Sequence, residues 1–234
     1  MKKLNNVTLI TVIGHNKPTP RENLALLDRI LKTSSDQISF GKIKILSALE
    51  EEYSFEQENL EVHKIESMTG RDYNQFCIKN LHEYIDTDFA LVFQTDGFIV
   101  NPDKWDDNFL NYDYIGAPWP DAQKSRVGNG GFSLRSQKFL NTVKNLDYID
   151  NIGLSGGTCT PEDHLICRHY YEKLVASDIK FAPLDVAIKF SFEQRIAEFS
   201  EWNNSMSMGF HGLFQNGWET DNFRSKIKKQ YNLS

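Results

Sequence analysis

Hydrophobic residues in the first half of the chain form short continuous runs separated by stripes with helical spacing. Residues 7–13 and 89–93 are almost continuously apolar, which is typical of strands buried on both faces of a parallel sheet. Residues 43–49 and 60–65 predict two further strands, and residues 72–84 predict a helix with one apolar face. This alternation of strands and helices predicts an α/β fold with a mainly parallel sheet covered by helices.

Two segments carry the signature of a helix start. Thr19 and Pro20 supply an N-cap and a first helical proline, and Glu22 is the third residue after the cap. Thr160 and Pro161 repeat the first two of these features. Both segments therefore predict a helix that begins at its proline.

The second half of the chain is less regular. Short strands are expected at residues 114–117 and 132–134, and a helix is expected at residues 137–146. Residues 202–218 are rich in aromatic residues, Gly and Asn. This composition favours a long functional loop over a core segment.

The composition is that of an ordinary soluble globular protein, because 40% of the 234 residues are hydrophobic and 25% are charged. We expect a single domain over residues 1–234. The formal net charge of −6 argues against a nucleic-acid partner bound through a broad basic surface. It leaves room for a small basic pocket that takes a diphosphate.

Cysteine usage and apolar length bear on where the protein works. The three cysteines form no CxxC pair, so we expect reduced thiols in a cytoplasmic protein. The apolar run at residues 7–13 is too short for a signal peptide or a membrane span. Residues 224–229 include four basic residues, which are either the solvated end of a helix or a contact with anionic lipid. The expected protein is soluble and at most peripheral at the inner face of the membrane.

Asp96 is the first candidate for chemistry, because it follows the strongly apolar run at residues 89–93. Open α/β sheets bind ligands at the carboxyl ends of their strands. A carboxylate there can hold a divalent cation that bridges a diphosphate. Gly97 would let the chain turn sharply and let a ligand come close. An ordinary turn aspartate is the alternative.

A glycine-rich segment consists of Gly128, Asn129, Gly130 and Gly131. Such a backbone can approach a ligand closely, and its exposed N–H groups can hold polar groups of a sugar or a phosphate. A hairpin loop is the alternative, because Asn-Gly is a strong turn signal.

Three further candidates lie nearer the C-terminus. Glu162 and Asp163 either satisfy the start of the helix predicted at Pro161 or place one carboxylate in a cleft as a general base. His211 lies in a segment rich in glycine and aromatic residues. Imidazole is a good ligand for ions of the Mn²⁺ class. A loop histidine satisfied by hydrogen bonds is the alternative.

Taken in order, these motifs resemble the shared pattern of GT-A glycosyltransferases, which has an Asp-x-Asp metal motif, a glycine-rich loop, an x-Glu-Asp motif and a C-terminal histidine. Gln94 stands where the first acid of the metal motif would be, so Asp96 is its single carboxylate. Such a site is weaker, and we expect the cation to bind tightly only with the donor diphosphate. Three strings also resemble a family of unknown function that is grouped with the GT-A enzymes and often occurs with polysaccharide-building genes: residues 93–96, 113–119 and 127–135.

The resemblance implies a GT-A (Rossmann-like) fold with a mixed, mostly parallel sheet flanked by helices. It places a donor-binding half at about residues 1–110, an acceptor-binding half at about residues 111–220 and a basic tail at residues 221–234. By the same resemblance, Asp96 and His211 would hold Mn²⁺ or Mg²⁺.

The implied reaction transfers a sugar, with inversion, from a nucleotide-diphosphate sugar to a glycan, and UDP is the expected nucleotide. Asp163 matches the base of the family motif and would take the proton of the acceptor hydroxyl, with Glu162 as the reserve candidate. The cation would act as a Lewis acid on the leaving diphosphate. The expected acceptor is an oligosaccharide or lipid-linked glycan in bacterial capsule or lipopolysaccharide synthesis.

Other residues are expected around the donor. Residues 14–18 and 69–74 would frame the nucleotide. Within the second segment, Arg71 would pair with phosphate and Tyr73 would pack near the base. Thr95, the middle residue of the metal motif, would contact the donor. Ordinary helix-start roles are the alternative for Arg71 and Tyr73.

Four aromatic residues are candidates for an acceptor platform, because aromatic faces pack well on the C–H faces of sugars: Trp119, Trp202, Phe210 and Trp218. Anchoring of the core or of a loop is the alternative.

Two rival functions would use the same residues. A metal-dependent hydrolase would deliver water to a nucleotide sugar and release free sugar. A non-catalytic carbohydrate-binding protein would keep the fold and bind without turnover, and the single acid of the metal motif favours this second rival.

Overall fold

The structure of the protein is a computed structural model. The residues that it describes are 1–14, 21–49, 57, 59–121, 125–152, 159–199, 201, 204–213 and 221–230. For residues 21–24, 204 and 221–224 this description covers the backbone alone.

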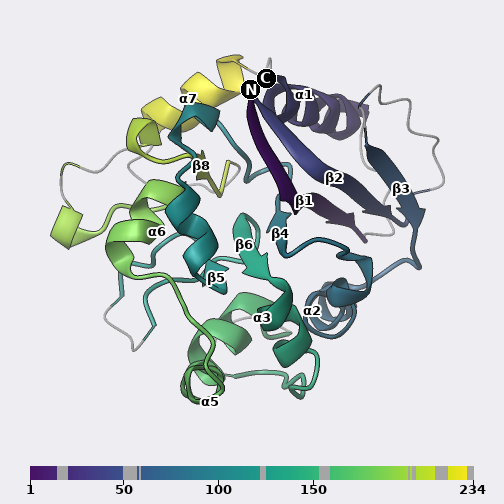
Figure 1. The fold of residues 1–234 in the computed structure, drawn as a ribbon, viewed down its shortest axis with the longest axis vertical. Helices are drawn as coiled ribbons and strands as arrows, with labels where there is room; N and C mark the ends of the chain where they lie inside the picture. The colour runs from purple at the N-terminus through teal and green to yellow at the C-terminus, as the bar shows by residue number, and fades with distance from the viewer. Residues whose placement is uncertain are drawn as a thin grey trace.

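A six-stranded sheet forms the centre of the molecule (Figure 1). Its strands are β1 (Lys2–Ile13), β2 (Ile38–Ser47), β3 (Leu60–Lys64), β4 (Phe89–Val92), β5 (Tyr114–Ile115) and β6 (Ser133–Ser136). They lie in the order β3-β2-β1-β4-β6-β5. Strands β1 to β4 are parallel, whereas β6 runs antiparallel to β4 and β5 runs antiparallel to β6. The mixed, mostly parallel sheet of a Rossmann-like fold is thus confirmed.

Helices cover both faces of this sheet. They are α1 (Arg21–Gln37), α2 (Gly70–Lys79), α3 (Gln137–Val143), α4 (Glu162–His164), α5 (Tyr171–Ala176), α6 (Leu184–Phe190) and α7 (Asp221–Gln230). Helices α1, α6 and α7 lie on one side, and α2, α3 and α5 lie on the other (Figure 1).

Shorter elements connect these helices and strands. The 3₁₀ turns are η1 (Leu81–Tyr84), η2 (Pro102–Lys104), η3 (Asp107–Asn111), η5 (Ala197–Phe199) and η6 (Asn204–Met206), and η4 (Leu165–His169) is a π-helical turn. A second, two-stranded parallel sheet joins β7 (Ser191–Phe192) to β8 (Gly209–Phe210).

Alternate side chains of β1 supply two separate cores, one on each face of the sheet. Val7 and Leu9 pack on the side of α1 and α6, whereas Ile10 and Val12 pack on the side of α2 and α3. Strands β1 and β4 lie next to each other, with Ile10 paired to Val92. The chain passes from β1 to β2 on one side, while β4 lies on the other. Their carboxyl ends therefore form the kind of switch point at which open α/β sheets bind ligands.

The helix predicted at residues 72–84 begins earlier and is interrupted. The Thr69 hydroxyl accepts a hydrogen bond from Asp72 N at 3.2 Å, and Asp72 Oδ2 accepts one from Thr69 N at 3.1 Å. This capping box starts α2 at Gly70. The α-helix ends at Lys79, with Asn80, a weak helix former, as its C-cap, and the tighter turn η1 follows.

The prediction that residues 202–218 form a loop rather than core is wrong for residues 207–213, which are mostly buried. Met208, Phe210 and Leu213 are at most 1% exposed and belong to the core on the α1 side. The physical reason is that β8 pairs with β7, which places Phe210 inside together with the flanking Met208 and Leu213. Phe210 therefore offers no face to a sugar, and its expected place in an acceptor platform is corrected to core packing.

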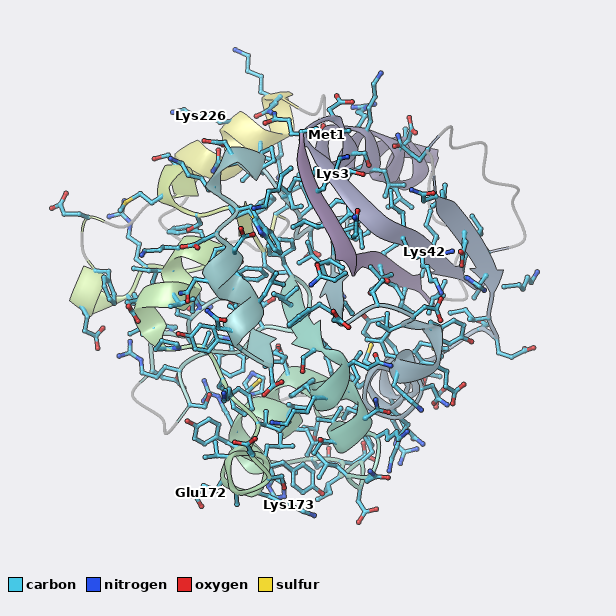
Figure 2. The ribbon with its side chains drawn as sticks, in the orientation of Figure 1. Met1, Lys3, Lys42, Glu172, Lys173 and Lys226 are labelled. Carbon is cyan, nitrogen blue, oxygen red and sulfur yellow. The ribbon has the colours of Figure 1, made fainter. Side chains whose placement is uncertain are left out.

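Charged side chains form the outer shell, with Glu172, Lys173 and Lys226 at the rim of the molecule (Figure 2). Within the basic tail, Lys226 and Lys229 are exposed, whereas Ile227 is 4% exposed and packs on the core. This geometry fits a solvated helix held by an apolar contact. None of the described helices is long and apolar enough to cross a membrane.

Candidate functional site

A tight turn after β4 carries the acid singled out from the sequence. Gln94 and Gly97 exchange two backbone hydrogen bonds of 2.9 and 3.1 Å, so Thr95 and Asp96 form the tip of the turn. The Asp96 side chain is 28% exposed. A partly accessible carboxylate therefore stands at the carboxyl edge of the sheet, as predicted.

His211 reaches this turn from the C-terminal part of the chain. It directly follows β8, and its backbone N–H donates to the Phe192 carbonyl at 2.9 Å. Its Nε2 lies 3.7 Å from Asp96 Oδ1. The backbone of the same segment is tied to the turn, because Leu213 N donates to the Asp96 carbonyl at 3.0 Å. Two side chains far apart in the chain thus meet, as the sequence predicted.

Two glycines allow His211 to approach so closely. A Cβ atom on Gly97 would lie 2.6 Å from His211 Cδ2, and one on Gly131 would lie 2.3 Å from His211 Nε2. The same atom on Gly131 would lie 2.6 Å from Gln94 Oε1. Gly97 does not have a left-handed backbone. Gly97 closes the tight turn without such a backbone, and its absent side chain makes room for the imidazole.

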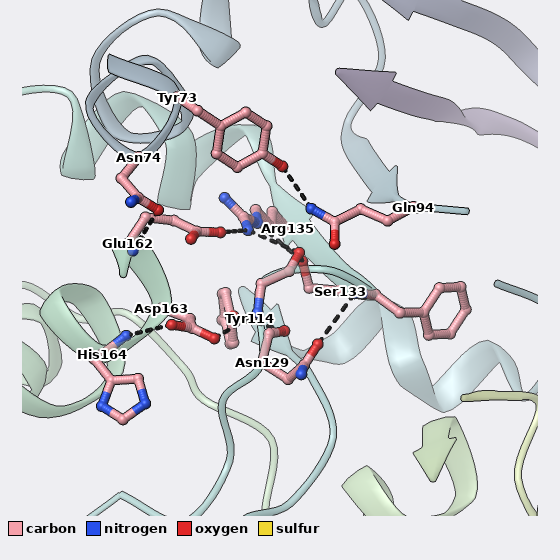
Figure 3. A network of polar contacts seen from close by, with 12 residues as sticks. Tyr73, Asn74, Gln94, Tyr114, Asn129, Ser133, Arg135, Glu162, Asp163 and His164 are labelled. Carbon is pink, nitrogen blue, oxygen red and sulfur yellow. Dashed lines mark hydrogen bonds and ion pairs between the residues drawn. The ribbon is translucent and has the colours of Figure 1, made fainter. Parts of the chain in front are cut away.

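Gln94, which replaces the first acid of the metal motif, is held by Tyr73 (Figure 3). Its Nε2 donates to Tyr73 Oη at 2.7 Å. The amide oxygen then lies on the side of Gly131 and His211. Burial raises the pKa of Tyr73, so the hydroxyl stays protonated. Tyr73 thus positions Gln94, a contact that was not among the expectations for this residue.

The pair formed by Asp96 and His211 fits a shared divalent cation. Two metal–ligand bonds of about 2.0–2.2 Å span at most about 4.4 Å. Atoms 3.7 Å apart can therefore bind one ion. In the described part of the chain, no group of three or more His, Cys, Asp or Glu side chains is placed to hold a metal. A cation here would need further ligands from a bound diphosphate.

Asn129 organises the glycine-rich segment from within. It is 4% exposed and has a left-handed backbone with φ of 63°, which Asn tolerates better than most residues. Its Nδ2 donates to Glu193 Oε1 at 2.8 Å, and its Oδ1 accepts from Phe132 N at 3.2 Å. Its carbonyl accepts from Tyr114 Oη at 3.2 Å. With these atoms in protein contacts, Asn129 is better placed to shape the site than to bind a sugar.

Gly130 links the glycine-rich segment to Asp163 and to Arg135. Its N–H donates to Asp163 Oδ2 at 3.0 Å, and its carbonyl accepts from Arg135 Nη2 at 3.2 Å. The expectation that N–H groups of this segment are exposed for a ligand is therefore wrong for Gly130. Glycine is required here because a Cβ atom would lie 1.8 Å from Glu162 Oε1.

Glu162 forms a buried ion pair with Arg135 (Figure 3). Glu162 Oε1 lies 3.0 Å from Arg135 Nη2, and the two side chains are 9% and 1% exposed. Arg135 Nε also donates to Ser133 Oγ at 3.0 Å. The backbone N–H of Glu162 donates to Asn74 Oδ1 at 3.1 Å. Glu162 is therefore engaged inside the protein.

Asp163 is the more accessible of the two carboxylates. Its Oδ2 accepts from Gly130 N at 3.0 Å, and its Oδ1 accepts from His164 N at 2.7 Å. Burial raises the pKa of Asp163, although these two hydrogen bonds oppose the rise. Burial and the charge of Asp163 also raise the pKa of Glu162, and Arg135 opposes that rise.

The helix-start interpretation of this segment is wrong for Thr160 and holds in part for Asp163. Thr160 Oγ1 accepts from Ile152 N at 3.1 Å, and α4 has Pro161 as an N-cap without a side-chain hydrogen bond. Asp163 does satisfy one N–H group at the helix start, that of His164. Its other oxygen points to the glycine-rich segment instead, so the carboxylate belongs to the site as well.

Trp119 is packed inside rather than presented to an acceptor. It is 6% exposed, with the Arg168 guanidinium 4.4 Å over its ring and the His164 ring centroid 4.9 Å away. A Cβ atom on Gly128 would lie 2.1 Å from the indole. Of the two roles open from the sequence, loop anchoring therefore describes Trp119 better than a sugar platform.

Arg71 lies on the surface, where its side chain is 53% exposed and its Nε is 2.7 Å from Asp150 Oδ2. This geometry favours a helix-start residue over a phosphate ligand. Residues 15–18, Trp202 and Trp218 lie outside the described residues, so the predictions for them stay predictions.

Two charged residues without a predicted role complete the site. Arg135 holds the glycine-rich segment, and Glu193 Oε1 lies 3.0 Å from His211 Nδ1. Burial alone lowers the pKa of His211, but the hydrogen bond and charge of Glu193 outweigh it, so this pKa is raised. Each charge directly follows apolar residues in the sequence. A charged residue in an apolar stretch is expected to be buried and therefore paired. This position in the sequence was the signal that could have pointed to Arg135 and Glu193.

The fold is shared with a known glycosyltransferase. A structure described as a glycosyltransferase involved in the glycosylation of the major capsid of PBCV-1 matches with a TM-score of 0.51 and 10% sequence identity, over 97% of this chain and 99% of that chain. The bifunctional IspDF from Campylobacter jejuni matches with a TM-score of 0.45 and 16% identity, over 76% of this chain and 48% of that chain, a likeness too loose to bear on function. The protein is thus of the Rossmann-like α/β class with a glycosyltransferase fold.

The chain belongs to the family described as a protein of unknown function, DUF5672, whose profile matches residues 54–211. No curated protein matches the sequence. The matched range contains the candidate residues from Arg71 to His211.

Proposed function

We propose that the protein is a glycosyltransferase that moves a sugar from a nucleotide-diphosphate sugar to a hydroxyl group of a glycan. One observation carries the proposal: Asp96, His211 and Asp163 converge on the glycine-rich segment. Asp96 and His211 lie 3.7 Å apart beside Gly131, and Gly130 donates to Asp163. A glycosyltransferase fold over nearly the whole chain supports this proposal.

Asp163 is the candidate for the general base. A base must reach the acceptor hydroxyl directly or through one water. The Glu162 side chain is 9% exposed and paired with Arg135, whereas Asp163 is half-buried. The raised pKa of Asp163 brings its proton affinity closer to that of an efficient base near neutral pH.

In the proposed reaction, the oxygen of the acceptor hydroxyl forms a bond to the anomeric carbon of the donor sugar. The bond from this carbon to the diphosphate oxygen breaks, and its electron pair leaves with the nucleoside diphosphate. The hydroxyl proton passes to a carboxylate oxygen of Asp163. A single displacement of this kind inverts the configuration at the anomeric carbon.

Asp96 and His211 are the residues that would hold a divalent cation, Mn²⁺ or Mg²⁺, with the amide oxygen of Gln94 beside them. When bound, the cation supplies Lewis-acid stabilisation of the charge on the diphosphate. The imidazole ligand favours Mn²⁺ over Mg²⁺. Since the site has a single carboxylate, tight binding is expected only together with the diphosphate.

We further propose UDP as the nucleotide and a growing surface polysaccharide, of the capsule or lipopolysaccharide type, as the acceptor. The resemblance of residues 113–119 and 127–135 to a family associated with polysaccharide-building genes supports this acceptor class. A cytoplasmic protein with a peripheral membrane contact fits such an acceptor. Exposed Lys226 and Lys229 on α7 would supply attraction to anionic lipid.

A thermal-shift screen of nucleotide sugars with and without Mn²⁺ tests donor binding. A ligand at about 100 times its Kd stabilises a protein by about 2.7 kcal/mol, so the correct donor should raise Tm clearly. Asp96→Ala is expected to lose this shift, whereas Asp163→Asn is expected to keep it. Asp103→Ala is the matched control, because its carboxylate is 68% exposed and lies outside the site.

The outcomes separate the proposed transferase from its rivals. A wild-type protein without a shift for any nucleotide sugar would contradict the proposal. Release of free sugar equal to the release of nucleotide, unaffected by added acceptors, would identify a hydrolase. A shift without turnover on any acceptor would identify a non-catalytic binding protein.

Gly131→Ala is expected to weaken the joint binding of UDP and Mn²⁺ by about 10- to 100-fold, because overpacking costs about 1–3 kcal/mol. The new methyl group would lie 2.3 Å from His211 Nε2 and would push the imidazole away from Asp96. Asp103→Ala is again the control, because its side chain is 68% exposed and lies outside the site. Calorimetric titration measures the affinity for UDP with Mn²⁺ in both variants. An unchanged affinity in Gly131→Ala would show that His211 does not take part in binding this ligand.

A further inference from the structure

Glu193 is a buried carboxylate on which two side chains of the site converge. It directly follows β7 and is 4% exposed. Its Oε1 lies 2.8 Å from Asn129 Nδ2 and 3.0 Å from His211 Nδ1. Its Oε2 is buried and, among the described residues, has no hydrogen-bond partner.

The surroundings of Glu193 do not explain it as a stabilising ion pair. Taking a carboxylate out of water costs several kcal/mol, which an opposite charge or several hydrogen bonds must offset. In the described part of the chain, the ion-pair partner within 4 Å is His211, which is charged only when protonated. A buried carboxylate with an unsatisfied oxygen is costly to the fold, so a role in the site is the better explanation.

The two contacts of His211 Nδ1, with Asn129 and with Glu193, decide which nitrogen of the imidazole carries the proton. Asn129 Oδ1 accepts from Phe132 N, so the amide presents its N–H group to His211 Nδ1, 2.8 Å away. Alone, this donor would favour a bare Nδ1 and a proton on Nε2. The Glu193 carboxylate accepts a hydrogen bond from Asn129 Nδ2 and one from His211 Nδ1. It therefore favours the Nδ1–H form of the imidazole instead. The Nε2 lone pair then faces Asp96.

We propose that Glu193 is a positioning residue that selects the Nδ1–H tautomer of His211 and thereby makes Nε2 available as a ligand for a divalent cation. A histidine that binds metal needs one bare nitrogen, and an outer carboxylate on its other nitrogen commonly fixes this form. The cation in this inference rests on the proposed function. The choice of tautomer does not, because it follows from contacts within the chain.

Nitrogen-15 NMR of the histidine side chains tests the tautomer directly, without metal and at an alkaline pH where imidazoles are neutral. The wild-type protein is expected to carry the proton on Nδ1 of His211. Glu193→Gln keeps the shape but removes the charge, so Asn129 is expected to drive the proton to Nε2. Glu198→Gln is the matched control, because this carboxylate is 53% exposed and pairs with Arg126.

The second readout is the affinity for Mn²⁺ in the presence of UDP, measured by electron paramagnetic resonance. Loss of an outer-shell partner typically weakens metal binding by about 10- to 100-fold, and this loss is expected for Glu193→Gln but not for Glu198→Gln. In a His211→Gln background, Glu193→Gln should cause no additional loss, because the two residues act through one ligand.

Each outcome bears on one of the two proposals. A wild-type His211 that carries its proton on Nε2, or a Glu193→Gln variant that keeps it on Nδ1, overturns the role of Glu193. A wild-type protein that binds no Mn²⁺ with UDP overturns the metal-dependent function, while the tautomer result stands by itself. If Glu193→Gln does not fold, Glu193→Asp retains the charge and is expected to keep the Nδ1–H form, and the opposite tautomer there overturns the inference.

Discussion

Replacing Asp163 with asparagine is expected to lower kcat for sugar transfer by about 10²- to 10⁴-fold, the usual contribution of a positioned general base. Asparagine has the same size, and its oxygen can still accept from Gly130 N, but it cannot take the proton of the acceptor. Binding of the nucleotide sugar should change little. Steady-state kinetics with a donor found by thermal shift provides the measurement.

The pH profile gives a second readout of the same substitution. Since the pKa of Asp163 is raised by burial, kcat/KM should fall as the pH decreases through this pKa, where the carboxylate gains a proton. The Asp163→Asn variant should lose this acid limb. Asp178→Asn, whose side chain is 82% exposed, is the control. Full turnover by Asp163→Asn would remove Asp163 from the role of base.

Arg135→Met is expected to lower the free energy of unfolding by about 3–5 kcal/mol, which is typical of breaking a buried ion pair from one side. Arg135 is 0% exposed and donates to Glu162, Gly130 and Ser133. Methionine fills much of the volume but leaves the Glu162 carboxylate buried without its cation. Urea unfolding monitored by circular dichroism measures the change.

Two further variants make the prediction for Arg135 specific. Arg135→Met combined with Glu162→Gln is expected to recover part of the loss, because no uncompensated charge remains. Lys2→Met is the control, since its ion pair with Asp107 is exposed on both sides, and the expected change is at most about 1 kcal/mol. An equal decrease in the free energy of unfolding in the Arg135 and Lys2 variants would show that the buried ion pair contributes no more to stability than the exposed one.

The central strands are predictable because burial on both faces makes nearly every residue apolar. A continuous apolar run is then enough to identify the strand. Residues 7–13 and 89–93 coincide closely with the buried parts of β1 and β4. The start of β1 is not predictable in this way. Lys2 pairs with Ile38 through the backbone, and backbone pairing leaves no mark on a polar segment.

The site is predictable where a ligand-type side chain stands in a distinctive local setting, as Asp96 does after its strand. Its contact with His211 depends on tertiary pairing that no local pattern encodes. Trp119 illustrates the opposite case, because an aromatic ring has the same appearance in a sequence whether it packs inside or faces a sugar. Glu193 is harder still, since its role exists only through partners contributed by other segments.

The pairing of β7 with β8 brings together two side chains, Glu193 and His211, that lie far apart in the sequence. Glu193 and His211 are the next positions after the last paired residues of these strands. The spacing between the carboxylate and the imidazole is therefore set by strand register and not by the length of the connecting chain. Loosening the pairing of these strands would draw His211 away from Asp96 and separate it from Glu193, while Asp163, held by His164 and Gly130, would stay in place.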